Sequence, residues 1–393
     1  MTGPRVALLS REYPPEVYGG AGVHIEHLSA ALAARGDLDI AVHCFGADRP
    51  GGEATAHQPW AALASGVDGG ALGVLSVDLA MAAAVEGADI VHSHTWYANL
   101  GGHLASLLHS VPHVMTAHSL EPLRPWKAEQ LGGGYTLSSF CERTAIEAAA
   151  AVIAVSSAMA DDIVAAYPAV DPARVLVIPN GIDAASYRPD AGTDVLDRLG
   201  VDPARPSVVF VGRMTRQKGI EHLLAAGALI DPSAQLVICA GAPDTVALGA
   251  ELRAAAAELA TVRGGVIWVE EMVARRDVVQ LVSHATVFVC PSVYEPFGLI
   301  NLEAMACETA VVASAVGGIV DVVVDGETGH LVDYDPDQPA AFASALAERV
   351  NQLLDDPARA AAFGRAGRLR VQDRFSWSAV ASATADLYRR LLT

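Results

Sequence analysis

Short runs of β-branched and other apolar residues alternate along the whole chain with longer stretches rich in alanine and leucine. This alternation predicts βαβ units around parallel sheets rather than a sandwich of antiparallel strands. The expected strands are residues 5–10, 39–44, 89–93, 113–117, 151–155 and 174–178 in the first half, and 207–211, 235–240, 266–269, 286–290, 310–313 and 330–332 in the second. The sequence therefore predicts an α/β protein with two doubly wound, Rossmann-like domains facing each other across a cleft.

Proline and glycine interrupt the pattern in residues 178–189, which places the domain boundary there. We expect a first domain over residues 1–183 and a second over 184–375, and 393 residues with 52% hydrophobic content suffice for two cores. Residues 376–393 form an amphipathic helix that must bury its apolar face against another part of the protein. That face carries Trp377, Val380, Ala381, Leu387, Tyr388 and Leu391.

A formal net charge of −19 argues against nucleic acid or an anionic membrane surface as a partner, because both require clustered positive charge. The five cysteines are widely spaced and include no CxxC pair, which is typical of reduced thiols in a cytoplasmic protein. The first apolar run is too short for a signal peptide. Residues 91–120 lack acidic and basic side chains, yet six histidines, two glycines and a proline argue against a membrane span.

Residues 295–303 are the most informative segment, because they follow a predicted strand and open a predicted helix with a glutamate at each end. The first turn of a helix has backbone N–H groups without intrahelical partners and partial positive charge, so it can hold a diphosphate. Glu295 can accept hydrogen bonds from sugar hydroxyls and Glu303 from a ribose. The alternative is that Glu295 caps the helix and Glu303 lies on a solvated face.

Two cations follow the first strand of the second half. That strand ends at Gly212, and Arg213 and Lys218 lie in the loop that we expect after it. Ligands bind beyond the carboxyl ends of parallel strands, where these side chains can neutralise a leaving diphosphate. A solvated loop is the alternative for either cation alone.

The first half carries further candidates. Gly19 and Gly20 belong to a glycine-rich loop that leads into a helix and can approach a phosphate, although such a turn is often only a tight connection. His118 follows a strand end and can contact the transferred sugar, with a structural hydrogen bond as the alternative. The histidines of residues 91–120 lack the helical spacing and the carboxylate of a zinc site, so we predict no metal.

As a set and in this order, these motifs resemble the retaining glycosyltransferases of the GT-B fold over nearly the whole chain. Residues 11–24 and 118–127 are similar to the actinobacterial glycogen synthase branch, which includes the α-maltose-1-phosphate synthases. The resemblance implies transfer of glucose from ADP-glucose to glucose 1-phosphate, with no metal cofactor. Nucleotide sugar and either glucose 1-phosphate or an α-glucan are then the partners, and a homodimer is left open.

The resemblance also implies that the helix of residues 376–393 returns to the first domain, and it implies residue roles. Arg213 and Lys218 neutralise the leaving diphosphate, Glu295 holds the donor glucose and His118 contacts it near C1 and C6. Donor binding is assigned to Gly19, Gly20, Met272, Phe297, Gly298, Leu299 and Glu303. Acceptor binding is assigned to Arg11, His94, Trp96, Tyr97, Arg124 and Lys127, which are the cations and aromatic rings of the first-domain loops.

One position departs from the family pattern. Larger bacterial glycogen synthases carry lysine where this chain has Val17, which removes one contact to the donor phosphate and favours a different acceptor. Elongation of an α-glucan, a GT-B epimerase and transfer from a UDP- or GDP-sugar remain alternatives, because no residue identifies the base. A non-enzymatic sugar-binding protein has no use for the two cations and the two glutamates.

Overall fold

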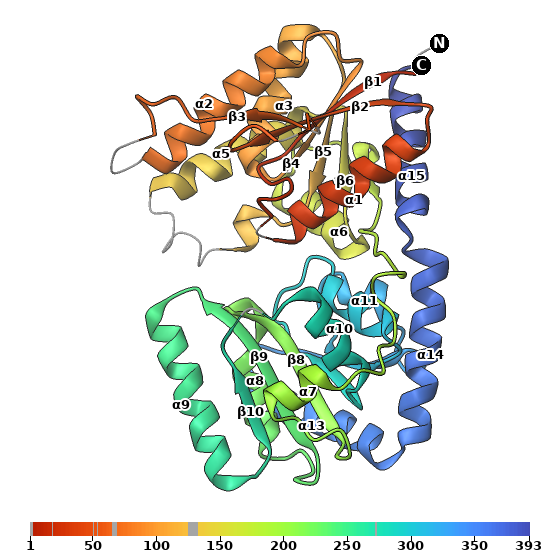
Figure 1. Cartoon of the computed structure of the whole chain (residues 1–393). Coiled ribbons are helices and arrows are strands. Elements are labelled where there is room, and N and C mark those ends of the chain that lie inside the picture. Colours follow the sequence, from red (N-terminus) through yellow and green to blue (C-terminus); the bar gives the residue numbers. More distant parts are fainter. Residues whose placement is uncertain are drawn as a thin grey trace. The chain divides into compact units, whose positions relative to one another are not determined.

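The computed structural model describes residues 3–17, 19–49, 51–52, 54–64, 69–124, 133–271 and 273–393. The chain divides into two compact units, each built around its own parallel sheet (Figure 1). Unit 1 comprises Met1–Gly181 with Trp377–Thr393, and unit 2 comprises Ile182–Ser376. The boundaries predicted from the sequence lie at residues 183/184 and 375/376. The predicted class, α/β with two doubly wound domains, is confirmed.

In unit 1, the described residues form a seven-stranded parallel sheet of order β3-β2-β1-β4-β5-β6-β7. The strands are β1 (Arg5–Leu9), β2 (Asp39–Phe45), β3 (Thr55–His57), β4 (Ile90–His94), β5 (His113–Ala117), β6 (Ala151–Ala154) and β7 (Val175–Val177). All except β3 were predicted within one residue at each end. The sequence does not reveal β3, because its three residues contain no apolar run.

The helices of unit 1 cover both faces of this sheet. They are α1 (Gly20–Ala34), α2 (Gly69–Ala84), α3 (Trp96–His109), α5 (Gly133–Ala148), α6 (Ser157–Ala166) and α15 (Trp377–Leu391). Side chains alternate between the two faces of a strand, so Leu8 packs with α1 and α15 while Leu9 packs with α2 and α3. Burial on both faces explains the apolar runs of β1 and β6. Strands β4 and β5 also bury polar side chains, among them His92, His94 and His113.

Helix α15 belongs to unit 1 although it is the last helix of the chain. Val380, Ala381, Leu387 and Tyr388 are buried in the same core cluster as Ile25 of α1. The Tyr388 hydroxyl also lies 2.6 Å from Nδ1 of His92 in β4. The apolar stripe seen in the sequence is therefore buried within unit 1.

In unit 2, the described residues form a six-stranded parallel sheet of order β10-β9-β8-β11-β12-β13. The strands are β8 (Ser207–Met214), β9 (Gln235–Pro243), β10 (Val266–Val269), β11 (Val287–Cys290), β12 (Ala310–Ser314) and β13 (Gly329–Val332). All six were predicted, although β8 and β9 each extend three residues further. Arg213 consequently lies in β8, at a register shift against β9, and not in the loop that the sequence suggested.

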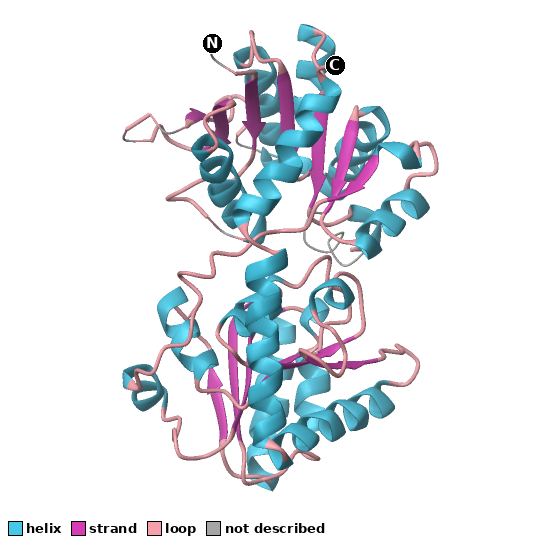
Figure 2. Ribbon diagram, turned by 90° about the vertical axis from the view of Figure 1, so that its right-hand side faces the viewer, coloured by secondary structure: helices cyan, strands magenta, loops and turns pink. Residues whose placement is uncertain are grey.

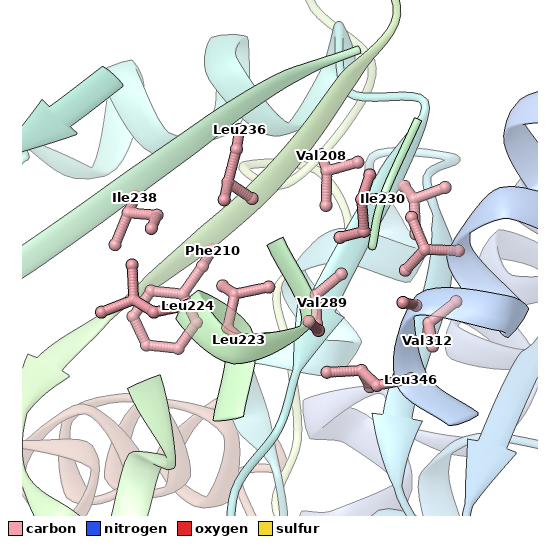
Figure 3. Packing of buried hydrophobic residues seen from close by; sticks show 14 of the residues in the cluster. Val208, Phe210, Leu223, Leu224, Ile230, Leu236, Ile238, Val289, Val312 and Leu346 are labelled. Carbon is pink, nitrogen blue, oxygen red and sulfur yellow. The ribbon is translucent and has the colours of Figure 1, made fainter. Parts of the chain in front are cut away.

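The helices of unit 2 are α7 (Asp194–Leu199), α8 (Ile220–Gly227), α9 (Val246–Val262), α10 (Arg275–Ser283), α11 (Leu299–Ala306), α12 (Ile319–Val322), α13 (Pro339–Asp355) and α14 (Pro357–Arg374). Figure 2 shows the strands with helices on both sides. One core cluster joins Phe210 of β8 and Val289 of β11 to Leu223 of α8 and Leu346 of α13 (Figure 3). This packing fixes the sheet and hence the positions of the loops at its carboxyl edge.

Two observations bear on the cellular setting. Among the described residues, no helix has both the length and the apolar character required to cross a membrane. All five cysteines are buried and unpaired with one another.

Asp78 is a carboxyl group inside unit 1 and offers a test of its packing. It is fully buried on α2, and its Oδ1 accepts a hydrogen bond of 3.0 Å from the backbone N–H of Gly101 on α3. Burial raises the pKa of this carboxyl well above its usual 3.8, despite the opposing hydrogen bond. A raised pKa means that its contribution to stability is complete below the pKa of the unfolded chain and is lost as the pH rises toward the folded value.

We therefore expect Asp78→Asn to be more stable than the wild type at pH 8, because the amide keeps the acceptor and has no charge to bury. The advantage should shrink at pH 5, since the wild-type penalty grows by at most about 1.4 kcal/mol per pH unit above the unfolded pKa. Thermal unfolding at both pH values measures this, and the exposed Asp48→Asn is the control. An advantage that does not change with pH would contradict the role given to burial.

Candidate functional site

The strand order of unit 2 changes direction between β8 and β11, and the candidate site lies at this point. Parallel strands that diverge in this way leave a crevice at their carboxyl ends, where ligands of doubly wound sheets bind. The 3₁₀-helix η3 (Arg216–Lys218) follows β8, and the loop to α11 follows β11. The two segments are joined by a backbone hydrogen bond of 2.9 Å from Val293 N–H to the Gln217 carbonyl.

Lys218 and Glu295 meet directly across this junction. Lys218 Nζ lies 2.6 Å from Glu295 Oε2, and Glu295 is only 7% exposed. The Ser292 hydroxyl donates a longer bond of 3.4 Å to the same oxygen. Burial is the largest single influence and lowers the pKa of Lys218, but the charge and hydrogen bond of Glu295, together with Cys290 and Glu303, outweigh it and raise the pKa of the lysine. The lysine is therefore a fixed positive charge at neutral pH.

The position directly after Lys218 requires glycine. Its φ of +61° lies in the left-handed region, and a Cβ atom at this position would lie 2.1 Å from the Pro291 carbonyl oxygen. Only glycine avoids both penalties. The close approach of η3 to the segment after β11 brings Lys218 to Glu295.

Helix α11 begins after Gly298, whose φ of +100° turns the chain into the helix. Phe297 is buried, and its ring lies 6.0 Å from the ring of Phe375 in an edge-to-face contact. The packed side chain anchors the turn. The phosphate contact predicted for this residue concerns its backbone amide. Leu299 begins the first helical turn, whose amides lack intrahelical partners, and the amides of Phe297 and Gly298 immediately precede it. This is the geometry from which helix N-termini bind anions.

Glu303 lies on α11 and has a partner that the sequence did not suggest. Its Oε1 accepts a hydrogen bond of 3.0 Å from the Tyr187 hydroxyl. Burial raises the pKa of Glu303 to about 7, against the opposing effects of Tyr187, Arg275 and Lys218. No local signal reveals Tyr187, because it follows the predicted domain boundary and its side chain meets Glu303 only after folding.

Arg213 forms an ion pair with a different carboxylate from the one that binds Lys218. Its guanidinium pairs with Asp244 at 2.7 Å, and its side chain is 44% exposed. A diphosphate must therefore compete with Asp244 for this arginine. The expectation that Arg213 lies in the loop after the strand is corrected: Arg213 is a residue of β8, and its acidic partner is Asp244.

In unit 1 the strand order changes direction between β1 and β4, and His118 follows the neighbouring β5. Its Nε2 lies 3.1 Å from Nδ1 of His94, at the end of β4. His94 is fully buried, so its contact is with His118 and not with solvent. The assignment of His94 to the acceptor stays a prediction, and its observed contact is with His118.

The glycine loop before α1 already holds an anion from its own chain. The backbone N–H of Gly19 donates a bond of 2.8 Å to Glu12 Oε2. Gly22 makes this possible, since a Cβ atom there would lie 2.5 Å from the same carboxylate oxygen. A phosphate at Gly19 and Gly20 must therefore displace the Glu12 side chain.

The residues assigned to the acceptor differ in their exposure. Arg11 lies over the Tyr97 ring at 4.0 Å, and Arg124 donates to the Ser119 hydroxyl at 3.0 Å. Trp96 is only 5% exposed and packs with Cys141, so it offers little surface to an acceptor. Two of the predicted contacts, Met272 and Lys127, lie outside the described residues.

Comparisons with known proteins agree with this architecture. The family model for glycosyl transferases group 1 matches residues 195–370, and that for glycosyltransferase family 4 matches residues 18–186. The chain is 57% identical to an α-maltose-1-phosphate synthase of Mycolicibacterium smegmatis and 55% identical to one of Mycobacterium tuberculosis, each over 390 residues, 98% of this chain and 99% of the relative. The solved sucrose-phosphate synthase of Thermosynechococcus elongatus matches with a TM-score of 0.79 and 29% identity over 99% of both chains. The predicted GT-B fold is thereby confirmed.

Lys218→Ala should lower kcat by ~10²-fold or more, because it removes a preorganised charge from a leaving diphosphate. Arg213→Ala should have an effect on the same scale. Steady-state kinetics measures both, with Arg216→Ala as the control: Arg216 lies in the same 3₁₀-helix, but its side chain is 65% exposed and its acidic partner is 3.9 Å away. Turnover near the wild-type value in both test variants would contradict the assignment.

Glu303 should make nucleotide binding depend on pH. Ribose hydroxyls donate to an ionised carboxylate, so binding favours the charged form and releases a proton. With a pKa of about 7, the affinity for ADP should rise as the pH goes from 6 to 8, by roughly tenfold.

Calorimetry with ADP on the wild type, Glu303→Gln and Glu295→Gln separates the two carboxylates and corrects for titration of the nucleotide phosphate. Glu303→Gln should lose the additional pH dependence, while Glu295→Gln should keep it and impair only transfer. If Glu295→Gln loses affinity for ADP and Glu303→Gln does not, the two roles must be exchanged.

Proposed function

The chain belongs to the GT-B glycosyltransferase family that includes the α-maltose-1-phosphate synthases, and from this premise we propose that it moves glucose from ADP-glucose to glucose 1-phosphate, with retention at the anomeric carbon, to form α-maltose 1-phosphate. The relatives that carry this name match the chain over almost its entire length. The observation that carries the proposal is the Lys218–Glu295 pair beside the N-terminus of α11.

This pair matches the charges of a nucleotide sugar. The bond that breaks joins C1 of glucose to a diphosphate oxygen, so negative charge grows on the leaving group. Lys218 and the amides of residues 297–299 are placed to stabilise that charge, and Glu295 is placed to accept hydrogen bonds from the glucose hydroxyls. A hydroxyl of the acceptor forms the new bond to C1, and its proton passes to an oxygen of the leaving phosphate on the same face.

Transfer by this route needs no metal ion. Lys218 and Arg213 provide the positive charge that a divalent cation would otherwise supply to the diphosphate. We also propose a cytoplasmic location, where the five unpaired cysteines remain reduced.

Two features of unit 1 favour a charged acceptor. Trp96 is buried, and Arg11 covers the Tyr97 ring, so the aromatic surface that a neutral glucan would use is reduced. Arg124 keeps a buried Nε with no hydrogen-bond partner among the described residues. A guanidinium with spare donors is suited to a sugar phosphate.

Initial rates with ADP-, UDP- and GDP-glucose against glucose 1-phosphate and glycogen test the proposal. We expect ADP-glucose and glucose 1-phosphate to be the preferred pair. Arg124→Ala should lower kcat/KM for glucose 1-phosphate by about tenfold or more, the effect of losing a charge-assisted hydrogen bond, and should affect glycogen less. Arg143→Ala, at an exposed position of α5, is the control.

Two outcomes would redirect the proposal. A higher kcat/KM for glycogen than for glucose 1-phosphate would make the chain a glucan-elongating enzyme. An unchanged use of glucose 1-phosphate by Arg124→Ala would remove this arginine from the acceptor site.

A further inference from the structure

Three histidines from separate elements of unit 1 converge on one point. They are His24 of α1, His94 at the end of β4 and His118 after β5. Each presents a ring nitrogen, and these three atoms lie within 4.8 Å of one another. The sequence excluded zinc by considering only residues 91–120, and His24 lies far upstream of that segment.

Two of the ring nitrogens are buried without a hydrogen-bond partner. They are Nε2 of His24 and Nε2 of His94. The neighbouring His92 is different, since its two ring nitrogens lie 2.6 Å from the Tyr388 hydroxyl and 2.7 Å from the Thr116 hydroxyl. Buried polar atoms usually have a partner, so two orphaned nitrogens in one cluster point to a missing ligand.

Asn180 orients His24 in the manner of a metal ligand. Its Oδ1 lies 2.7 Å from His24 Nδ1, and Asn180 is only 4% exposed. A carbonyl oxygen only accepts, so Nδ1 carries the hydrogen and the lone pair is on Nε2. Metal-binding histidines are commonly held by a hydrogen bond of this kind from the other ring nitrogen.

The protonation state of the cluster is also suitable. Burial lowers the pKa of His24 to about 4, and burial together with the neighbouring histidines holds the pKa of His94 and of His118 well below the usual 6.5. All three rings are therefore neutral at pH 7, and neutral imidazole is the form that binds metal.

We propose that His24, His94 and His118 form a binding site for a divalent transition-metal ion such as zinc, with water as the fourth ligand. Three neutral imidazoles are a ligand set that zinc, cobalt and nickel accept and that magnesium and calcium do not favour. Nitrogens around tetrahedral zinc are about 3.3 Å apart, so small ring movements from the observed separations close the site.

The bound ion inhibits transfer, a consequence that rests on the proposed function. In the proposed function His118 contacts the donor glucose. If a metal ion holds the His118 ring, the ring is withdrawn from that contact. The site is therefore inhibitory, and catalysis itself proceeds without the ion. The alternative is that the rings only pack together, as the edge-to-face contact of His24 with Trp377 at 5.4 Å shows they can.

Cobalt(II) provides a direct test that does not depend on activity, because its visible absorption reports tetrahedral nitrogen coordination. The full chain is freed of metal with EDTA, dialysed and titrated with cobalt chloride, and zinc then displaces the cobalt in calorimetry. We expect one ion per chain. His24→Gln should weaken binding by roughly 100-fold, the loss of one ligand, and Asn180→Ala by about 10-fold through the lost orientation of His24.

Matched controls identify the site. His27→Gln changes a histidine of the same helix that stacks on Trp377 at 5.3 Å, and His57→Gln removes a separate pair in which His43 Nδ1 lies 3.1 Å from His57 Nε2. Neither should alter the affinity. Circular dichroism checks folding, and if His24→Gln does not fold, Asn180→Ala decides the test. No tetrahedral cobalt spectrum, or equal losses in the His57→Gln control, would overturn the proposal.

Activity separates this proposal from the proposed function. The EDTA-treated enzyme should retain full turnover, zinc should inhibit it at the concentration that fills the site, and a chelator should reverse the inhibition. Loss of activity on chelation that zinc restores would overturn the inhibitory role. Absence of transfer with every donor would refute the proposed function and leave the cobalt result standing, whereas transfer without cobalt binding would refute only the metal site.

Discussion

The ion pair between Lys218 and Glu295 is the interaction on which the candidate donor site depends. The carboxylate is almost fully buried and the ammonium is largely so, and each is the principal opposite charge of the other. Removal of one partner leaves an uncompensated charge in a poorly solvated place, which is far more costly than the net value of the pair. The pair therefore fixes both side chains of the candidate donor site in one arrangement.

That pair in turn depends on the topology of the sheet. Only where the strand order reverses, between β8 and β11, do the ends of two adjacent strands send their chains in opposite directions. Gly219 then allows η3 to approach the Pro291 carbonyl closely. The core of β8, β11, α8 and α13 beneath this edge keeps the two strand ends in register. The loops thus provide the functional side chains, and the packed core below them fixes where those side chains lie.

Unit 1 uses burial in a different way. Its carboxyl edge collects histidines that burial keeps neutral, so they act as lone-pair donors and acceptors and not as cations. The last helix supports this arrangement, because Tyr388 holds His92 and Trp377 packs against His24. An isolated view of residues 91–120 misses this, since the supporting residues come from both ends of the chain.

The sequence by itself determined the class of fold, the positions along the chain of twelve of the thirteen strands in the described residues, and the positions of the chemical motifs. Hydrophobic periodicity and glycine positions are local properties, and a segment such as residues 295–303 contains its strand end, helix start and two glutamates together. Only the tertiary structure decided which distant groups meet. Lys218 and Glu295 are 77 residues apart and Tyr187 and Glu303 are 116 apart, while Trp96 became a core residue and Arg213 acquired Asp244. Such pairings depend on packing between elements, and no local pattern of residues encodes them.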